Sequence, residues 1–115
     1  MGAIYLNGEY VPKSGPVALS WYQRAAERGN VAAQLTVGSM YRRGLGDIQH
    51  DYEQALKWYH KAAAQDSGEA EFEIGAMYQE GLGVIKNPDT AAEWYRKAVQ
   101  HGYSPAGVAL RNLQR

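Results

Sequence analysis

The chain has 115 residues, enough for one domain with a modest core, and its 45% hydrophobic and 21% charged residues exclude an intrinsically disordered protein. Twelve basic residues balance twelve acidic residues without forming a basic stripe, which argues against a nucleic-acid partner. The absence of cysteine excludes disulfides and cysteine-bound metals. No apolar run approaches the ~20 residues that span a bilayer, and no secretory signal is present. We therefore expect no membrane insertion and a cytoplasmic location, unless the chain is a piece of a larger protein.

The first element, "YLNGEYVP" at residues 5–12, has two interpretations. An Asn-Gly pair between alternating apolar residues is a strong β-hairpin signal. However, "MGAIYLNGEYV" (1–11) also aligns with "IGAMYQEGLGV" (74–84), which places Gly8 at the position of Gly81. Glycine there would end a helix in the left-handed conformation. We predict a helical turn before Gly8 and no hairpin, because the alignment is part of a register that runs through the chain.

This register is an internal repeat. The segments "ALSWYQRAAERGN" (18–30), "ALKWYHKAAAQDS" (55–67) and "AAEWYRKAVQHGY" (91–103) align, and Trp21, Trp58 and Trp94 are 37 and 36 residues apart. The segments "VGSMYRRGLG" (37–46) and "IGAMYQEGLG" (74–83) precede the second and third of them. A period of this length is typical of stacked helical pairs. Each repeat therefore has a helix A with the pattern Gly-x-x-Tyr-x-x-Gly and a helix B with a Trp-Tyr pair.

Helix ends follow from glycines and from the 3.6-residue periodicity of apolar residues. Helix B ends at Gly29 in the first repeat and at Gly102 in the third, but Asp66 stands at this position in the middle repeat. That helix has the alternative of continuing to a cap at Gly68, because Asp tolerates the left-handed conformation less well than Gly. We predict an all-α fold with helices at residues 16–28, 32–43, 51–65, 69–80, 88–101 and 105–113.

The repeated segments resemble the Sel-1-like repeat, a relative of the tetratricopeptide repeat, over nearly the whole chain. The resemblance implies an α–α superhelix, a right-handed solenoid of about three helix-turn-helix repeats whose A helices line a concave, protein-binding face. Residues 1–115 then form a single domain with repeats 1–30, 31–67 and 68–103. The first repeat lacks the first half of helix A, and Tyr10 replaces its second loop glycine. Residues 104–115 are expected to form a C-terminal capping helix, because Arg111 replaces a helix A glycine there.

A binding site is expected on the part of helix A that packing leaves uncovered. With Ala33, Val37 and Tyr41 on the packed side, the opposite arc is basic in the second repeat and acidic in the third. We expect Phe72, the one aromatic side chain on this arc, to be exposed. The candidate protein-binding residues are Leu35, Ser39, Arg42, Arg43, Phe72, Glu73, Gln79 and Glu80, with Thr36, Ala76, Leu6 and Asn7 on the same arc. For any single residue, the alternative is an ordinary solvated helix face.

The sequence gives little support for a metal site, a small-ligand site or a catalytic site. His50, His60 and His101 share neither a spacing nor a helix face, so we expect solvated histidines and no metal site. The Trp-Tyr pairs recur on the packing face, which favours core over an aromatic ligand site. The "GLG" turns (44–46, 81–83) lack the Lys-Ser/Thr ending of a phosphate loop. No catalytic constellation can be nominated, so we expect neither an enzyme nor a cofactor.

We therefore expect a non-enzymatic interaction module that binds a peptide or protein partner on the concave face. The alternative is a purely structural segment of a longer Sel-1-like solenoid whose function lies elsewhere in the parent protein. Trp58 should be the most damaging single truncation, because packed repeats flank it. We also expect self-association through the N-terminal unit, or an upstream segment that covers it, because its shortened helix A leaves Ile4, Leu6 and Trp21 poorly covered.

Overall fold

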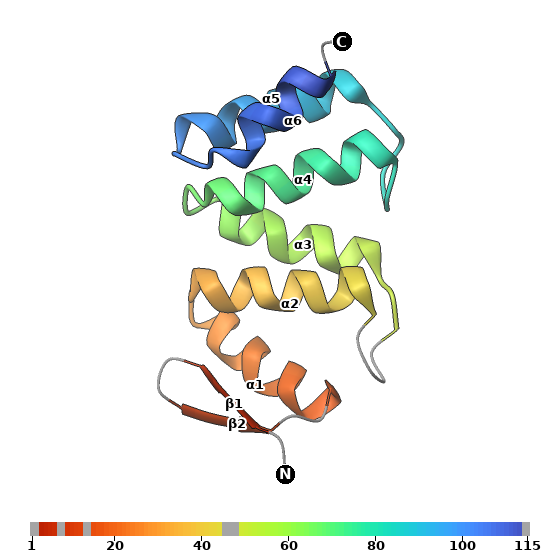
Figure 1. The fold of residues 1–115 in the computed structure, drawn as a ribbon. Helices are drawn as coiled ribbons and strands as arrows, with labels where there is room; N and C mark the ends of the chain where they lie inside the picture. Colours follow the sequence, from red (N-terminus) through yellow and green to blue (C-terminus); the bar gives the residue numbers. More distant parts are fainter. Residues whose placement is uncertain (1–2, 7–8, 13–14, 45–48, 114–115) are drawn as a thin grey trace. The chain divides into compact units, whose positions relative to one another are not determined.

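The computed structural model describes residues 3–6, 9–12, 15–44 and 49–113 (Figure 1). The chain divides into two compact units, Met1–Trp58 and Tyr59–Arg115. Helix α3, Tyr52–Ala63, contains the boundary between them. Six helices and one two-stranded sheet make up the regular structure of the described residues.

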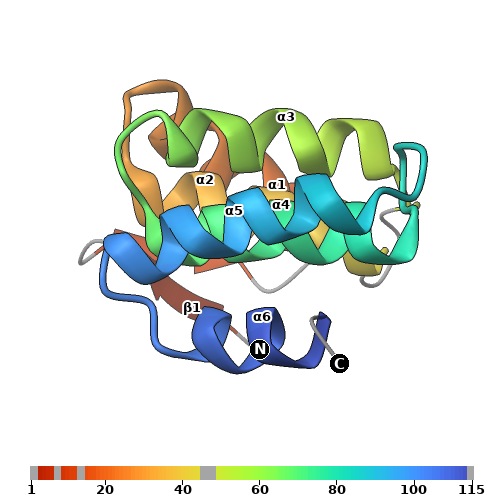
Figure 2. The ribbon, with the colours of Figure 1, turned by 90° about the horizontal axis from the view of Figure 1, so that it is seen from above.

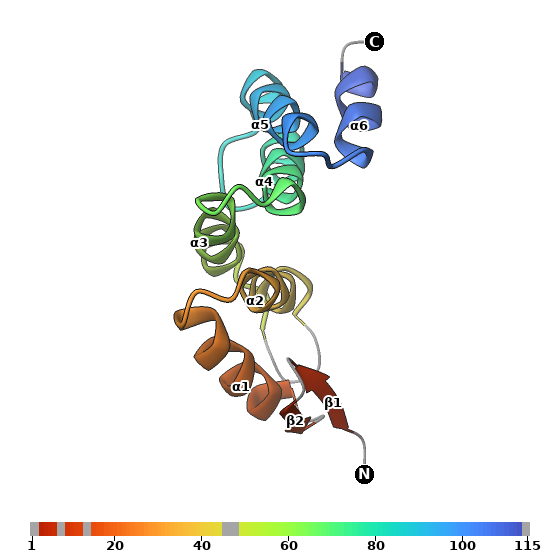
Figure 3. The ribbon, with the colours of Figure 1, turned by 90° about the vertical axis from the view of Figure 1, so that its left-hand side faces the viewer.

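Unit 1 consists of a β-hairpin followed by a pair of helices. Strands β1 (Ala3–Leu6) and β2 (Glu9–Pro12) are antiparallel, and helices α1 (Gly15–Glu27) and α2 (Val31–Arg43) pack against each other (Figure 3). Strand β2 also contacts α1. Small residues alternate with large ones in the core, so the helices approach closely while the larger side chains fill the remaining space. This core contains Ala18, Tyr22, Ala26, Ala33, Val37, Met40 and Trp58.

The strands show that the prediction of a helical turn before Gly8 was wrong. The pairing places Tyr5 opposite Tyr10 and Leu6 opposite Glu9, with residues 7 and 8 outside the described part. The physical reason lies at position 10. Its counterpart in the third repeat is Gly83, which has a positive φ of 72° that tyrosine adopts poorly. The turn that ends helix A therefore cannot be reproduced here, and the local strand preference of these residues prevails.

The two complete A helices, α2 and α4 (Gly68–Glu80), begin and end in the same way. The side chains of Asn30 and Ser67 each accept a hydrogen bond from the backbone N–H three residues later, at 2.8 and 3.2 Å. Gly44 and Gly81 end the helices in the left-handed conformation, with φ of 62° and 72°. These caps satisfy N–H and C=O groups that a helix end leaves without partners. The lengths of both helices are thus set by local sequence.

Unit 2 contains the end of α3 and helices α4, α5 (Pro88–Gln100) and α6 (Pro105–Leu113) (Figure 2). Helix α5 packs against both α4 and α6. Gly75 permits the close approach of α4 and α5, since a Cβ atom there would lie 2.7 Å from Cε1 of Tyr95. Ala91, Tyr95, Ala98 and Ala106 are buried in this core, with Phe72, Tyr78, Tyr103, Ala109, Leu110 and Leu113 packed around them.

The helical repeat fold is confirmed, and the observed helices begin and end within two residues of the predicted bounds. The alternative of a cap at Gly68 is wrong. Helix α3 ends at Ala63, and Asp66 adopts the left-handed conformation with a φ of 63°, as Gly29 and Gly102 do in their repeats. Asp66 is the only non-glycine residue with positive φ in the described part of the chain. Its turn therefore carries backbone strain that glycine would avoid.

Candidate functional site

The predicted binding residues fall on two helices in different units. On α2, Leu35, Ser39 and Arg42 are half-buried and Arg43 is exposed. On α4, the half-buried residues are Phe72, Glu73 and Gln79, and the exposed one is Glu80. Arg43 and Glu80 occupy the same repeat position at the last residue of their helices, and they carry opposite charges.

The prediction that Phe72 is an exposed aromatic was wrong. Its ring centroid lies 5.6 Å from that of Tyr95 and 5.2 Å from that of Tyr103, and it packs against the core of unit 2. Gln79 also has a packing role, because its Oε1 accepts a 2.6 Å hydrogen bond from the hydroxyl of Tyr95. The helical periodicity of α4 did not account for the side chains that α5 and the segment after it bring to these two residues.

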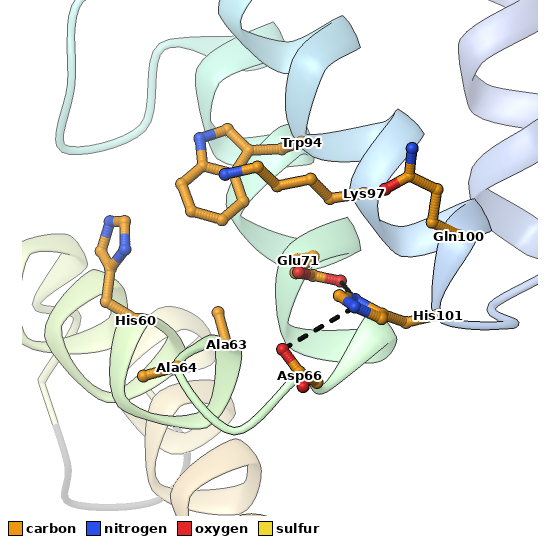
Figure 4. A pocket seen from close by; sticks show the side chains of 9 residues that line it. All are labelled: His60, Ala63, Ala64, Asp66, Glu71, Trp94, Lys97, Gln100 and His101. Carbon is orange, nitrogen blue, oxygen red and sulfur yellow. Dashed lines mark hydrogen bonds and ion pairs between the residues drawn. The ribbon is translucent and has the colours of Figure 1, made fainter.

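A pocket of about 520 Å³ lies in unit 2, at a place that the sequence did not indicate (Figure 4). Helices α3, α4 and α5 line it together with the turn that contains Asp66. At one end His60 faces Trp94, and at the other Glu71 and His101 lie together. The lining residues are His60, Ala63, Ala64, Asp66, Glu71, Trp94, Lys97, Gln100 and His101.

A histidine paired with carboxylates occupies one end of the pocket. Nδ1 of His101 lies 2.7 Å from Oε1 of Glu71, and its Nε2 lies 3.7 Å from Oδ1 of Asp66. The side chain of Glu71 is buried, so an unpaired negative charge there would be costly. The hydrogen bond to Glu71, with smaller contributions from the charges of both carboxylates, raises the pKa of His101 above its ordinary value. At this end of the pocket, one histidine therefore faces two carboxylates.

A tryptophan with two basic side chains occupies the other end. The imidazole of His60 makes an edge-on contact with the Trp94 ring, with centroids 5.3 Å apart. The ammonium group of Lys97 lies 4.5 Å from the centroid of the same ring. Burial, followed by the positive charge of Lys97, lowers the pKa of His60 below its ordinary value. The neutral form of the His60 imidazole is therefore favoured at this end of the pocket.

All three histidines are exposed, as expected, but His60 and His101 also make side-chain contacts that were not expected. His60 lies on α3 and His101 directly follows α5, so residues of two different repeats meet at one pocket, which no spacing in the sequence reveals. Glu71 did leave a signal, because it falls between Ala70 and Ile74 on the buried stripe of α4. Among the described residues, no group of three or more His, Cys, Asp or Glu side chains is arranged to hold a metal ion.

Comparison with known proteins gives the same repeat. The family model described as the Sel1 repeat matches residues 1–30, 31–67 and 68–103. The chain belongs to the Sel1 repeat family. Sel1 repeat proteins are generally protein-interaction scaffolds without catalytic activity. A comparison with curated proteins found no match.

Solved structures of other Sel1 repeat proteins have the same fold. A Sel1 repeat protein from Oxalobacter formigenes is 36% identical, with a TM-score of 0.77 over 85% of this chain and 40% of that one. The protein c5321, a protective antigen present in uropathogenic Escherichia coli strains, is 32% identical, with a TM-score of 0.80 over 88% of this chain and 21% of that one. Cysteine rich protein B of Helicobacter pylori, at 24% identity, has a TM-score of 0.74 over 81% of this chain and 69% of that one. The chain thus spans less than half the length of the first two proteins.

None of the helices in the described part of this Sel1 repeat chain has the length and apolar character needed to cross a membrane.

Proposed function

We propose that the chain is a non-enzymatic interaction module that binds a peptide or protein partner through the arcs of α2 and α4 that face away from the packed side. The observation that carries the proposal is the pair Arg43 and Glu80. Both side chains are exposed at the same repeat position, yet their charges are opposite. Packing does not require either charge, whereas a partner with a matching charge pattern would select both.

The test is affinity capture from a lysate of the source organism, followed by titration of the purified partner against three variants. Arg43→Glu and Glu80→Arg reverse the charge on each arc, and each should weaken binding about tenfold or more. Phe72 is left unchanged, because its contacts with Tyr95 and Tyr103 make truncation a test of folding. Arg96→Glu on the exposed side of α5 is the matched control and should bind as the parent does.

The competing function is a structural segment of a longer solenoid. The observation in its favour is that the chain covers only 40% and 21% of the lengths of two of its structural relatives. No specific capture by the parent chain, or equal loss in all three charge-reversal variants, would favour this alternative. Circular dichroism of each variant establishes that a loss of binding does not come from unfolding.

A further inference from the structure

We propose that the pocket of unit 2 binds a carboxylate group between Lys97 and His60, with the aliphatic part of the ligand against Trp94 and the neighbouring alanines. This site is separate from the arcs of α2 and α4, so it stands or falls independently of the function proposed above. The ligand class is a short aliphatic carboxylate presented by a peptide, either an acidic side chain or a C-terminus.

The carboxylates of the pocket and the ammonium group of Lys97 lie at opposite ends of it. Asp66 and Glu71 are its carboxylates, and both lie against His101 at the opposite end from Trp94. Among the described residues, no carboxylate forms an ion pair with Lys97, whose contact is with the face of the Trp94 ring. The end formed by His60, Trp94 and Lys97 therefore has a positive charge that no anion of the described residues neutralises.

The contact between a basic side chain and the tryptophan ring is not specific to this pocket. A basic residue three positions after the tryptophan recurs, and in unit 1 the guanidinium of Arg24 lies 5.5 Å from the centroid of Trp21. The cation–π contact alone is therefore a packing feature. Unit 2 adds a histidine in edge-on contact with the ring and a pocket that the histidine, the tryptophan and the lysine line together. In unit 2, a cation and a second N–H donor thus line a common space.

The volume and the lining of the pocket indicate the size and the chemistry of the ligand. A volume of about 520 Å³ is within the range of small-ligand pockets and fits a single side chain with its backbone. Ala63, Ala64 and the Trp94 ring provide apolar surface for an aliphatic stem. No arginine lines the pocket, so the forked donors typical of phosphate sites are missing from the lining. One ammonium and one imidazole suit the single charge of a carboxylate.

The structure also gives the expected pH dependence. A bound carboxylate would favour the imidazolium form of His60, which burial and then the charge of Lys97 disfavour in the free protein. The other titratable groups of the pocket, Asp66, Glu71 and His101, lie at the opposite end. Binding should therefore tighten as the pH falls from about 8 to about 6, while the ligand remains ionised.

The experiment is a nuclear magnetic resonance titration of the full chain that follows the indole N–H of Trp94 and the imidazole of His60. The probes are acetyl-Gly-Glu-Gly-amide, acetyl-Gly-Gly-Gly with a free C-terminus, and acetyl-Gly-Gln-Gly-amide as the neutral control. We expect saturable shifts with one or both carboxylate peptides, and the tighter one identifies the source of the carboxylate. Shifts with neither, or equal binding of the glutamine peptide, would overturn the proposal.

Variants test the two donors. Lys97→Met keeps the stem over Trp94 and removes the charge, and it should weaken the carboxylate peptide about tenfold or more. His60→Gln should abolish the pH dependence of binding. Arg24→Met removes the matching cation in unit 1 and should leave the affinity unchanged. An equal effect of Arg24→Met, or tighter binding of inorganic phosphate than of either peptide, would contradict a carboxylate site at Lys97.

Discussion

Helices α2 and α4 are the same element of the repeat, and they differ in how one buried polar position is satisfied. Both bury an alanine, a polar residue, a branched aliphatic residue, a glycine and a methionine at equivalent positions. The polar residue is Gln34 in α2, whose Nε2 donates a 3.0 Å hydrogen bond to the carbonyl of Ala26. In α4 it is Glu71, which lies against His101. A repeat can therefore conserve its apolar packing and still exchange a neutral donor for a charge, provided that another element supplies a partner.

The largest expected effect concerns the tryptophans beside these two helices. Trp58 is 4% exposed and belongs to the core that packs on α2, whereas its repeat counterpart Trp94 is half-buried. Trp58→Ala should lower the free energy of unfolding by ~3–5 kcal/mol. Trp94→Ala should cost roughly 1–2 kcal/mol, because less apolar area returns to water. Urea denaturation followed by circular dichroism measures both, and equal losses would show that the two positions are packed alike.

The second prediction exchanges the polar residues directly. Gln34→Glu replaces the amide N–H donor by a buried carboxylate oxygen against the carbonyl oxygen of Ala26, and it should lower the free energy of unfolding by at least ~2 kcal/mol at neutral pH. Glu71→Gln should lower the free energy of unfolding by less, because it replaces a buried carboxylate, which requires His101 as its partner, by an uncharged amide. Chemical denaturation of the two variants checks the order. A greater loss for Glu71→Gln would mean that the ion pair, and not the neutral amide, is the stronger solution.

The third prediction concerns the glycine that lets α4 approach α5. A Cβ atom at Gly75 would meet Cε1 of Tyr95 at 2.7 Å and the carbonyl oxygen of Ala91 at 3.2 Å. Gly75→Ala should therefore destabilise the protein by ~1–3 kcal/mol. Gly107→Ala in α6 is the control, since its Cβ atom would meet only Cγ2 of Val99 at 3.9 Å. Helix propensity should make that variant up to ~1 kcal/mol more stable. Thermal melts of both variants distinguish steric exclusion at Gly75 from a general intolerance of alanine.

The smallest effect is the pH dependence that Glu71 gives to α4. Because the pKa of His101 is raised in the folded state, its stabilising contribution is complete below its ordinary pKa and is lost as the pH rises through the raised value. His60 acts in the opposite direction, since its lowered pKa removes stability as the pH falls below the ordinary value. The difference in Tm between the parent and Glu71→Gln should thus shrink from about pH 6 to about pH 9. His60 is common to both proteins, so its contribution cancels. A constant difference would contradict the assigned ion pair.

The helices could be predicted from the sequence because their ends depend on nearby residues. Caps at Asn30, Ser67, Gly44 and Gly81 act within one helical turn, and the repeat shows each signal more than once. The hairpin was missed for a related reason. The repeat register outweighed the local evidence at residues 5–12, although Tyr10 already stood where the turn of the third repeat needs a glycine.

The pocket could not be predicted, because it combines repeated residues with a histidine that the other repeats lack. His60 and Trp94 lie on B helices of different repeats, and the position of His60 is occupied by Gln23 in the first repeat and Arg96 in the third. Only packing brings such residues together. The arc on helix A could be predicted in outline, but the burial of Phe72 depends on Tyr103, which lies beyond the end of α5. A helical wheel of α4 contains no information about that residue.

The expected self-association of the N-terminal unit stays a prediction, but the described part of the structure does not contain the helical face from which it was argued. The segment that contains Ile4 and Leu6 is strand and not helix, and Trp21 packs against the core of unit 1. The uncovered helical face from which the prediction was argued is therefore absent from the described structure. Sedimentation over a concentration series still distinguishes a monomer from a dimer.

The buried polar residue also links each A helix by a hydrogen bond to an element that comes earlier or later in the chain. Gln34 ties α2 backward, to the last turn of α1, whereas Glu71 ties α4 forward, to the residue that follows α5. Local opening of a protein proceeds in cooperative groups of contacting elements. Amide protons of α2 should therefore exchange with solvent together with those of α1, and those of α4 together with those of α5. The buried polar side chain thus reinforces the packing that already links α2 to the helix before it and α4 to the helix after it.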